Sequence, residues 1–357
     1  MDKILKFLDN TGKALEKKAV PKKLGVWMPE ELHLELTYKC NSKCIMCNLR
    51  FIDTKEKELT PEELLKVFQS KLLGGVKLVV LSGGEPMLRN DFLDIVSLAA
   101  RSFPTANILI LSNYLNTKLV LKNLESIKYI TDLKRISLGT SIDGLGLNHD
   151  RIRGAKKSFD CLIKSLNLIK NKHPKIYQSL NFTITPKNCS RIFSVYDWCK
   201  KNDWHVSFQV MVQKKEAKKL VWNKKHISTV EKQIEKVISD VCKTNGILSP
   251  EVLYLNKGML SFLLSLHYIP KYIKERKRYY PNCPCGEKFA MIDPFGTLYF
   301  CPVHKDKTAG SLKNNGFDDL WVSNKAEETR KFFNKGKCHC WLTCSYSRML
   351  GDAISSI

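Results

Sequence analysis

Two hydrophobic patterns alternate between residues 33 and 212 of the chain. Short apolar runs of five to eight residues are typical of buried strands, and the longer stretches between them repeat apolar residues every three or four positions, as amphipathic helices do. Strands that alternate with helices predict parallel βαβ units. The predicted strands are 33–37, 77–82, 106–112, 135–142, 178–185 and 205–212. The helices predicted between consecutive strands are 60–73, 91–103, 117–127, 156–172 and 189–202.

The first of these helices has clear boundary signals. Thr60 is expected to be its N-cap, Pro61 occupies the first helical position, and Glu63 completes a capping box. The pair Gly74-Gly75 is expected to end the helix before the next strand. With right-handed crossovers, these units form either a doubly wound sheet or a partial α/β barrel.

Three further segments depart from this pattern. Residues 1–32 predict a basic amphipathic segment whose apolar face either lies on a membrane surface or packs on its own domain. Residues 213–281 predict a helical linker after a core of residues 33–212, and residues 282–350 predict a small cysteine-rich domain with a hairpin at 290–301. The apolar face of the first segment carries Ile4, Leu5, Leu8 and Leu15.

Charge and cysteine usage narrow the class of protein. The formal net charge of +24 favours acidic partners such as phosphates, nucleic acid or anionic lipids. Because sequence-specific nucleic-acid recognition depends strongly on arginine and most of the basic residues are lysine, nucleic acid is disfavoured. The sequence has neither an apolar run long enough to span a membrane nor a signal-peptide pattern, so we expect a cytoplasmic protein. Thirteen cysteines in a reducing compartment indicate metal or redox chemistry.

Three of these cysteines follow the first predicted strand. Cys40, Cys44 and Cys47 have Cys-x3-Cys-x2-Cys spacing. Thiolates hold iron–sulfur clusters, and a cubane usually takes four of them, so three leave one iron open for a small ligand. The alternatives are an incomplete zinc knuckle or three buried thiols, but zinc sites usually bring cysteines or histidines in pairs. The spacing favours an iron–sulfur cluster.

Polar groups follow the other predicted strands. Because the carboxyl ends of parallel strands meet at one edge of a sheet, we expect these groups to lie near the three cysteines. Two glycines allow a backbone to approach a ligand closely, and Glu85 adds a carboxylate. Together the groups suit a ligand with an amine, a carboxylate and a ribose. They are Ser82-Gly83-Gly84-Glu85-Pro86, Ser112-Asn113, Ser141-Ile142-Asp143-Gly144 and the stretch from His149 to Arg153.

The paired motifs Cys40-x3-Cys44-x-Met46-Cys47 and Gly83-Gly84-Glu85-Pro86 resemble those of the radical S-adenosylmethionine (radical SAM) enzymes. The resemblance covers residues 33–212 and implies a partial (β/α)6 TIM-like barrel. It also implies a [4Fe–4S] cluster on Cys40, Cys44 and Cys47, S-adenosylmethionine chelated to the open iron, and an electron donor such as flavodoxin or ferredoxin. The residues implied to contact S-adenosylmethionine are Met46 near the adenine, Gly83, Gly84 and Glu85 at the methionine amino group, Ser141 and Arg153 at the ribose or the methionine carboxylate, and Asn113 at the ribose.

A second group of six cysteines lies near the C-terminus, at 283, 285, 301, 338, 340 and 344. It resembles the SPASM or shorter Twitch extension of radical SAM enzymes, which holds auxiliary iron–sulfur clusters. The full SPASM pattern has seven cysteines, so the resemblance implies one auxiliary [4Fe–4S] cluster here. Its implied ligands are Cys283, Cys301, Cys340 and Cys344, and Cys338 is the next candidate. Cys285 is either a ligand or a bystander, His339 is an alternative ligand, and a structural zinc is the alternative metal.

The resemblance implies an enzyme that cleaves S-adenosylmethionine reductively and abstracts hydrogen from an unidentified substrate. The net reaction is expected to oxidise or mature a small molecule, a glycan, a lipid-linked precursor or a peptide, and the lysine excess favours an anionic one. One alternative is GTP cyclisation of the molybdenum-cofactor type, whose auxiliary Cys-x2-Cys-x13-Cys pattern and C-terminal Gly-Gly are missing here. The other is a zinc-containing nucleic-acid-binding protein, which leaves the Gly-Gly-Glu-Pro motif unexplained.

Overall fold

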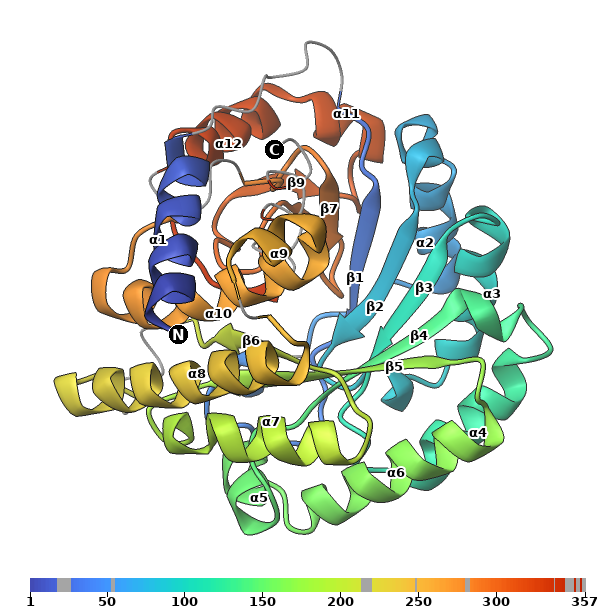
Figure 1. The fold of residues 1–357 in the computed structure, drawn as a ribbon. Coiled ribbons are helices and arrows are strands. Elements are labelled where there is room, and N and C mark those ends of the chain that lie inside the picture. Colours follow the sequence, from blue (N-terminus) through green and yellow to red (C-terminus); the bar gives the residue numbers. More distant parts are fainter. Residues whose placement is uncertain are drawn as a thin grey trace.

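The computed structural model describes residues 1–17, 27–52, 55–212, 220–247, 249–279, 283–336 and 338–343, together with residues 350 and 354. Within them, one nine-stranded sheet has the order β6-β5-β4-β3-β2-β1-β7-β8-β9 (Figure 1). Strands β1 to β7 pair in parallel, and β8 and β9 pair antiparallel. The strands are β1 (Glu31–Thr37), β2 (Leu78–Gly83), β3 (Asn107–Leu111), β4 (Ile136–Ser141), β5 (Tyr177–Ile184), β6 (Val206–Val210), β7 (Phe289–Ile292), β8 (Thr297–Tyr299) and β9 (Thr308–Ser311).

Helices cover the outer face of the six strands from β1 to β6, which curve into a partial barrel (Figure 1). All six predicted strands, and the helices predicted between them, are present within a few residues of the expected positions, which confirms the α/β architecture. The helices are α1 (Asp2–Lys17), α2 (Pro61–Phe68), α3 (Phe92–Ser102), α4 (Thr117–Ile127), α5 (Leu147–Arg153), α6 (Ser158–Lys172), α7 (Ile192–Lys201), α8 (Lys224–Thr244), α9 (Glu251–Leu255), α10 (Lys257–Glu275), α11 (Phe317–Val322) and α12 (Asn324–Asn334).

Helix α2 begins as predicted but ends earlier. The backbone N–H of Glu63 donates to Thr60 Oγ1 at 3.3 Å and the N–H of Thr60 donates to Glu63 Oε2 at 2.7 Å, so the capping box is confirmed. The prediction that Gly74-Gly75 ends this helix is wrong, because the helix stops at Phe68 and Lys71–Gly75 form a separate 3₁₀ helix. Between them Ser70 is extended and donates its hydroxyl to Asp318, a tertiary contact that the local pattern does not reveal.

The two faces of the sheet differ in polarity. In β1, Leu32, Leu34 and Leu36 are buried in the main apolar core, whereas His33 and Glu35 lie on the opposite face. Residues paired across neighbouring strands share a face, and the register pairs Glu35 with Ser82. In the same way, Ser141 is paired with Asn181 and Asn181 with Ser207. The inner face of the partial barrel therefore carries polar side chains towards the carboxyl ends of these strands, whereas Val80 and Leu109, in register with His33, make the same face apolar further from those ends.

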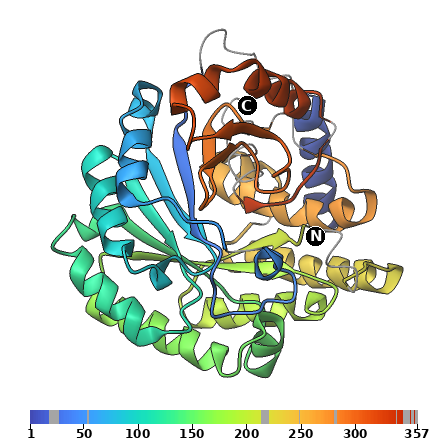
Figure 2. The ribbon, with the colours of Figure 1, turned by 180° about the vertical axis from the view of Figure 1, so that it is seen from behind.

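The C-terminal segment continues the sheet and reaches across its opening. Strand β7 pairs in parallel with β1, and Asp293 accepts the N–H groups of Phe295 (3.0 Å) and Thr297 (2.8 Å) in the tight turn to β8, so the predicted hairpin is confirmed. At the other end of the sheet, the N–H of Val210 in β6 donates to the carbonyl of Trp341 at 3.1 Å. Figure 2 shows the C-terminal elements in the gap between β1 and β6. The domain boundary at residue 282 stays a prediction.

Helix α1 packs on α10. Ile4, Leu8 and Leu15 are buried in the apolar core, and Asp9 forms an ion pair with Lys271 of α10. The apolar face of α1 is thus covered by the protein's own chain, as in the second alternative above. None of the described helices is both long enough and apolar enough to cross a membrane.

Candidate active site

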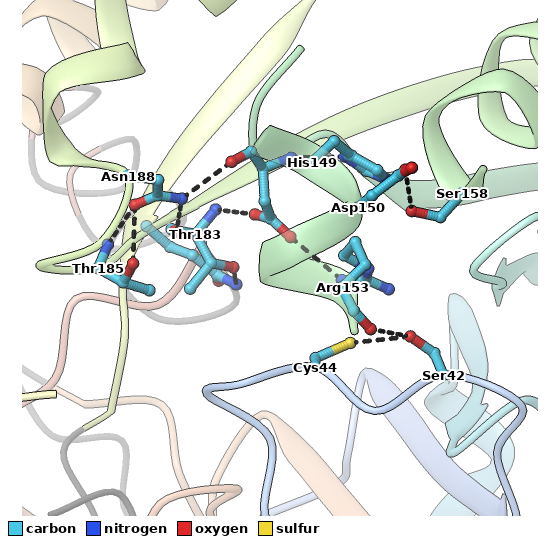
Figure 3. Close-up of polar contacts among 11 residues, drawn as sticks. Ser42, Cys44, His149, Asp150, Arg153, Ser158, Thr183, Thr185 and Asn188 are labelled. Atoms are coloured by element: carbon cyan, nitrogen blue, oxygen red, sulfur yellow. Dashed lines mark hydrogen bonds and ion pairs between the residues drawn. The ribbon is translucent and has the colours of Figure 1, made fainter. Parts of the chain in front are cut away.

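The loop that follows β1 carries the three predicted cluster ligands. Cys40 is exposed, Cys44 is buried and Cys47 is half-buried. The N–H of Cys47 donates to the carbonyl of Cys44 at 3.1 Å, which closes a tight turn that contains Met46. Ser42 lies between the first two cysteines: its N–H donates to Cys40 Sγ at 3.4 Å, and its hydroxyl lies 3.2 Å from Cys44 Sγ (Figure 3). Ser42 therefore orients two of the three sulfurs.

The end of α5 anchors this loop. The carbonyl of Arg153 accepts the N–H of Lys43 at 3.2 Å and the hydroxyl of Ser42 at 2.7 Å, and the carbonyl of Ile152 accepts the N–H of Ile45 at 2.9 Å. Carbonyls at the end of a helix lack partners within the helix, so they are available for such contacts. Gly154 follows with φ +63°, and a Cβ there would lie less than 3.0 Å from the Lys43 carbonyl oxygen. Only glycine fits this contact without displacing the loop.

We expect Gly154→Ala to displace the cysteine loop and to lower the free energy of unfolding by about 2–3 kcal/mol, since it adds a backbone clash to the cost of a left-handed residue. Gly246→Ala is the matched control: its φ is +62°, close to that of Gly154, but a Cβ there meets no atom within 4 Å, so only the conformational cost of about 1 kcal/mol remains. Urea denaturation and bound iron should be measured for both variants. Equal losses in the two would contradict this account of Gly154.

Gly83 and Gly84 bring the end of β2 against the same loop. The N–H of Gly84 donates to the carbonyl of Thr37 at 2.7 Å, and the N–H of Glu85 donates to that of Lys39 at 2.9 Å. A Cβ on Gly83 or Gly84 would lie less than 3.0 Å from the Thr37 or Lys39 carbonyl oxygen, respectively. The two glycines are thus required by the close approach of two backbones, whatever they contribute to a ligand.

The Glu85 carboxylate is buried beside the loop, with a side chain that also meets the end of β3. It accepts the N–H of Asn113 at 2.8 Å and that of Met87 at 3.4 Å. Burial raises its pKa above the ordinary value, and the backbone N–H of Asn113 opposes that shift. The amide of Asn113 donates to Asn41 Oδ1 at 2.7 Å and lies 3.6 Å from Cys40 Sγ. The structure therefore brings Glu85 and Asn113 together with the cysteine loop, as the sequence predicted.

Arg153 is held by a buried carboxylate (Figure 3). Its Nη1 lies 3.2 Å from Oδ2 of Asp143, whose Oδ1 accepts the N–H of Thr183 at 2.9 Å. Burial raises the pKa of the Asp143 carboxyl, and the guanidinium of Arg153 opposes that shift. Burial also works against the charge of Arg153, but the negative charges of Cys44 and Asp143 outweigh it and hold the Arg153 pKa above its ordinary value. Arg153 is thus a fixed cation between Asp143 and the cysteine loop.

Ser141 and Met46 have predicted roles that the structure places but does not test. Ser141 is the last residue of β4, half-buried on the polar inner face. Met46 is half-buried in the turn between Cys44 and Cys47. Both positions are compatible with contacts to a ligand at the carboxyl end of the sheet, and both assignments stay predictions.

Sequence reasoning missed Ser42 and Asn188. The amide nitrogen of Asn188 donates to the carbonyls of Asp143 (3.1 Å) and Thr183 (3.0 Å), and its oxygen accepts the N–H of Thr185 at 2.7 Å. Asn188 thereby ties the end of β5 to the strand end that holds Arg153 (Figure 3). Ser42 could have been noticed as the hydroxyl between two cysteines. Asn188 has no such signal, because its role exists only once β4 and β5 are paired.

His149 makes stability depend on pH. Its Nδ1 accepts the N–H of Asp143 at 3.1 Å, and burial lowers its pKa to about 3. The folded protein keeps the ring neutral while the unfolded chain binds a proton below its pKa near 6.5, so stability is lost as pH falls from about 6.5 towards 3, by about 1.4 kcal/mol per unit. Between about pH 7.5 and 5.5, His149→Gln should lose about 1.4 kcal/mol less unfolding free energy than the unsubstituted protein. Equal losses in urea denaturation would show that His149 does not titrate this way.

The second cysteine group is buried beside β7 and β8. Cys285 is hydrogen-bonded to Cys283 and Cys301, and these bonds lower the pKa of both partner thiols. Cys301 Sγ also accepts the N–H of Val303 at 3.4 Å, and Cys338 Sγ accepts a hydrogen bond from Arg278 at 2.9 Å. Cys340 is buried as well, whereas Cys344 lies outside the described residues. As arranged here, no three His, Cys, Asp or Glu side chains of the described chain could hold a single metal ion.

His339 faces α10. Its Nδ1 lies 3.3 Å from the hydroxyl of Tyr272, and the two rings are 5.8 Å apart. Next to it, Trp341 donates its indole N–H to the carbonyl of Ser265 at 3.1 Å. Helix α10 therefore supports the segment that carries Cys338 and Cys340. The role of His339 as an alternative ligand stays a prediction.

Residues 34–187 match the radical SAM superfamily, and residues 283–345 match the SPASM iron–sulfur cluster-binding domain. The chain therefore carries a radical SAM domain and a SPASM domain. The two matches fall on the two cysteine groups described above, and they indicate S-adenosylmethionine and an iron–sulfur cluster at the first group and auxiliary iron–sulfur binding at the second. The thiolates present in both groups are the donors such clusters require.

Radical SAM relatives with named roles include the mycofactocin maturase MftC of Mycolicibacterium smegmatis, 24% identical over 88% of this chain and 76% of that protein. The sporulation killing factor maturation protein SkfB of Bacillus subtilis is 30% identical over 49% of this chain and 41% of its own length. Several of the relatives are matched over only about half of their length or less. Among solved structures, anSMEcpe with bound AdoMet is similar in fold, with a TM-score of 0.62 at 18% identity, covering 86% of this chain and 81% of that one.

Proposed function

We propose that this radical SAM protein is an enzyme that cleaves S-adenosylmethionine reductively and abstracts a hydrogen atom from a substrate held near the carboxyl ends of the barrel strands. The observation that carries the proposal is the meeting of Cys40, Asn113 and the buried Glu85 at one end of the sheet. When bound by Cys40, Cys44 and Cys47, a [4Fe–4S] cluster supplies the electron that breaks a carbon–sulfur bond of S-adenosylmethionine and yields a 5′-deoxyadenosyl radical.

The chain's own residues would hold and orient the cofactor. The buried Glu85 carboxylate would accept hydrogen bonds from the methionine amino group beside Gly83 and Gly84. Arg153, held by Asp143, would attract the methionine carboxylate, and Ser141 and Asn113 would bind the ribose. Met46 would pack near the adenine. Because Glu85 and Arg153 are already fixed by hydrogen bonds in the protein, binding would cost little reorganisation.

The SPASM domain would hold one auxiliary [4Fe–4S] cluster, with Cys283, Cys301, Cys338, Cys340 and Cys344 as its candidate ligands. Burial of the four described members of this set supports such a site, since it keeps water and oxygen away from the sulfurs. An auxiliary cluster would accept the electron left on the substrate after hydrogen abstraction, so the net reaction would be an oxidation. The first electron would come from a small redox protein such as flavodoxin or ferredoxin.

A peptide or a small molecule is proposed as the substrate. Relatives named as maturation proteins support a peptide, as does the solved structure of SuiB from Streptococcus suis bound to its precursor peptide SuiA, which resembles this chain with a TM-score of 0.60. The alternative of GTP cyclisation has relatives named probable GTP 3′,8-cyclase, of which one is 27% identical over 47% of this chain. Because the auxiliary cysteine spacing of that branch is missing here, we do not favour it.

Anaerobic reconstitution tests this function. We expect a brown protein with about eight iron atoms per chain, four in each cluster, that forms 5′-deoxyadenosine from S-adenosylmethionine when a reductant is added. A colourless zinc protein would refute the proposed function. An iron content of about four atoms per chain would contradict the proposed auxiliary cluster but would be compatible with the radical chemistry.

A further inference from the structure

Helix α5 presents an exposed face beside the cysteine loop. Leu147, Arg151 and Gly154 follow one another at spacings of four and three residues, so they share one face of the helix, and all three are exposed. Lys43 of the loop packs at the end of this face, since a Cβ on Gly154 would lie 3.2 Å from the Cβ of Lys43. Figure 3 shows the loop directly below the end of the helix. The exposed face of α5 and the cysteine loop therefore form one continuous surface.

This surface is basic. Asp150, the carboxylate of α5, accepts the N–H groups of Lys157 at 2.8 Å and Phe159 at 2.9 Å and the hydroxyl of Ser158 at 2.8 Å, so it is held at the start of α6. Asp160, exposed in the first turn of α6, offsets part of the positive charge. In the described part of the chain, no carboxylate forms an ion pair with any of the four exposed cations of the surface. These cations are Lys43, Arg151, Lys156 and Lys157. Cations without ion-pair partners attract an acidic partner.

The surface also has a small apolar centre. Leu147 is 71% exposed, one helical turn before Arg151. An apolar centre with a charged rim is the usual arrangement of a protein–protein interface. Complexes between redox proteins are among the smallest and weakest of such interfaces, so one exposed leucine among four cations is compatible with a complex of that kind.

A membrane or a nucleic acid fits this surface less well. A helix that lies on a membrane has a broad apolar face, whereas Ile152, the other aliphatic residue of α5, is 4% exposed. Nucleic-acid bases stack on free aromatic faces. The nearby ring of Phe159 already packs edge-on against His149 and Trp198, with ring centres 5.8 and 6.0 Å apart.

The outer side of the cysteine loop gives a redox partner access to the first cluster. In the proposed function, S-adenosylmethionine and the substrate occupy the inner side, so an electron donor has to approach from outside. Lys43 directly precedes Cys44 and is exposed, whereas Ser42 and Cys44 are buried. Because electron transfer slows steeply with distance, a donor bound against Lys43 and the end of α5 is well placed to reduce a cluster held by this loop.

We propose that the surface formed by Lys43, Leu147, Arg151, Lys156 and Lys157 is the docking site of a small acidic protein that delivers one electron to the first cluster. The proposal rests on the proposed function in taking the three cysteines to hold a redox-active cluster. Carboxylates of the donor would meet the four cations, and an apolar group beside its redox centre would cover Leu147. In the transfer, the donor is oxidised by one electron and the cluster is reduced by one, with no bond made or broken.

Two reductants test the proposal on the anaerobically reconstituted protein: flavodoxin hydroquinone, an acidic protein that has to dock, and dithionite, which does not. In a variant with Arg151→Gln, Lys156→Gln and Lys157→Gln, the flavodoxin concentration that gives half the maximal rate of 5′-deoxyadenosine formation should rise at least about tenfold. The rate with dithionite should stay the same. Lys43 is left unchanged because it lies in the cysteine loop itself.

The matched control carries Lys232→Gln, Lys236→Gln and Lys243→Gln, at three exposed positions of α8, and should respond to both reductants as the unsubstituted protein does. Added salt should raise the half-maximal flavodoxin concentration of the unsubstituted protein more than that of the α5 variant, since it screens the exposed charges. Leu147→Ser should also raise this concentration while the rate with dithionite stays the same.

Four results would overturn the proposal: an unchanged response of the α5 variant to flavodoxin, an equal loss in the control, an equal slowing with dithionite, or tighter binding of phosphatidylserine vesicles than of flavodoxin at this surface. Binding of dye-labelled flavodoxin is measured separately by fluorescence anisotropy. A protein that forms 5′-deoxyadenosine with dithionite but binds flavodoxin equally well in the α5 variant would reject the docking site and keep the proposed chemistry. A protein that binds flavodoxin through these cations but forms no 5′-deoxyadenosine with dithionite would do the reverse.

Discussion

Replacing Cys40, Cys44 and Cys47 together by alanine should abolish formation of 5′-deoxyadenosine and remove about four iron atoms per chain. The loop directly after β1 contains no other cysteine that could hold this cluster. The SPASM cysteines are untouched, so about four iron atoms should remain. Chromatography of the reaction mixture and iron analysis on the same sample measure the two effects. Persistent 5′-deoxyadenosine in this variant would refute the assignment of the active site.

The control for this variant also replaces three cysteines by alanine, but at positions outside the two cysteine groups. Cys161, Cys189 and Cys242 lie outside both cysteine groups, and Cys189 and Cys242 are buried in the apolar core. Their joint replacement by alanine should cost some stability through lost packing but should leave iron content and S-adenosylmethionine cleavage unchanged. A loss of iron in the control would mean that thiol removal as such, not the loop, limits cluster assembly.

Asp143→Ala should lower the free energy of unfolding by about 3–5 kcal/mol, since it leaves the charge of Arg153 buried without a partner. The Asp143 side chain is fully buried and that of Arg153 is 14% exposed. The substitution also removes the acceptor of the Thr183 N–H, and it should weaken binding of S-adenosylmethionine because Arg153 then loses its fixed position. Urea denaturation measures the first effect, and equilibrium binding of S-adenosylmethionine measures the second.

Two further variants show whether the buried ion pair of Asp143 and Arg153 is responsible for the predicted loss of stability. The double variant Asp143→Ala with Arg153→Leu should be more stable than Asp143→Ala alone, because it removes the uncompensated charge. Asp197→Ala, which breaks an exposed ion pair with Lys201 on α7, should cost less than about 1 kcal/mol. If the double variant proved no more stable than the single one, the cost would lie in lost packing around Asp143.

Local patterns were enough to predict the six parallel strands and the helices between them, because each element has its own period and its own boundary residues. They were also enough to predict that Glu85, Asn113 and Cys40 meet, since the carboxyl ends of neighbouring parallel strands lie together. Where a contact joins distant segments, the patterns failed. The early end of α2 depends on the contact of Ser70 with Asp318, and the choice between the two predicted positions of α1 depends on its packing against α10.

The partners of the site residues were hidden for the same reason. The sequence near Arg153 does not indicate that its carbonyl anchors the cysteine loop, because that contact joins positions 111 residues apart. Asn188 is an ordinary polar residue in sequence and becomes part of the site only through the pairing of β4 with β5. The reason for Gly154 is likewise found in Lys43, far away in the chain.

The pairing of β7 with β1 has a consequence for how the protein opens and for what happens if it is truncated. Strand β1 leads into the cysteine loop, and its backbone is bonded on one side to β2 and on the other to the strand that precedes Cys301. A local opening event that releases the SPASM hairpin would expose the amides along one side of β1. The amides of the hairpin and those of β1 should therefore exchange with solvent as one cooperative unit. A shortened chain that lacks residues 283–357 would present β1 as a bare edge, which is prone to pair with a second molecule and aggregate. Removal of the auxiliary domain is therefore a poor way to ask what its cluster does, and single-cysteine substitutions that leave β7 in place are the cleaner probe.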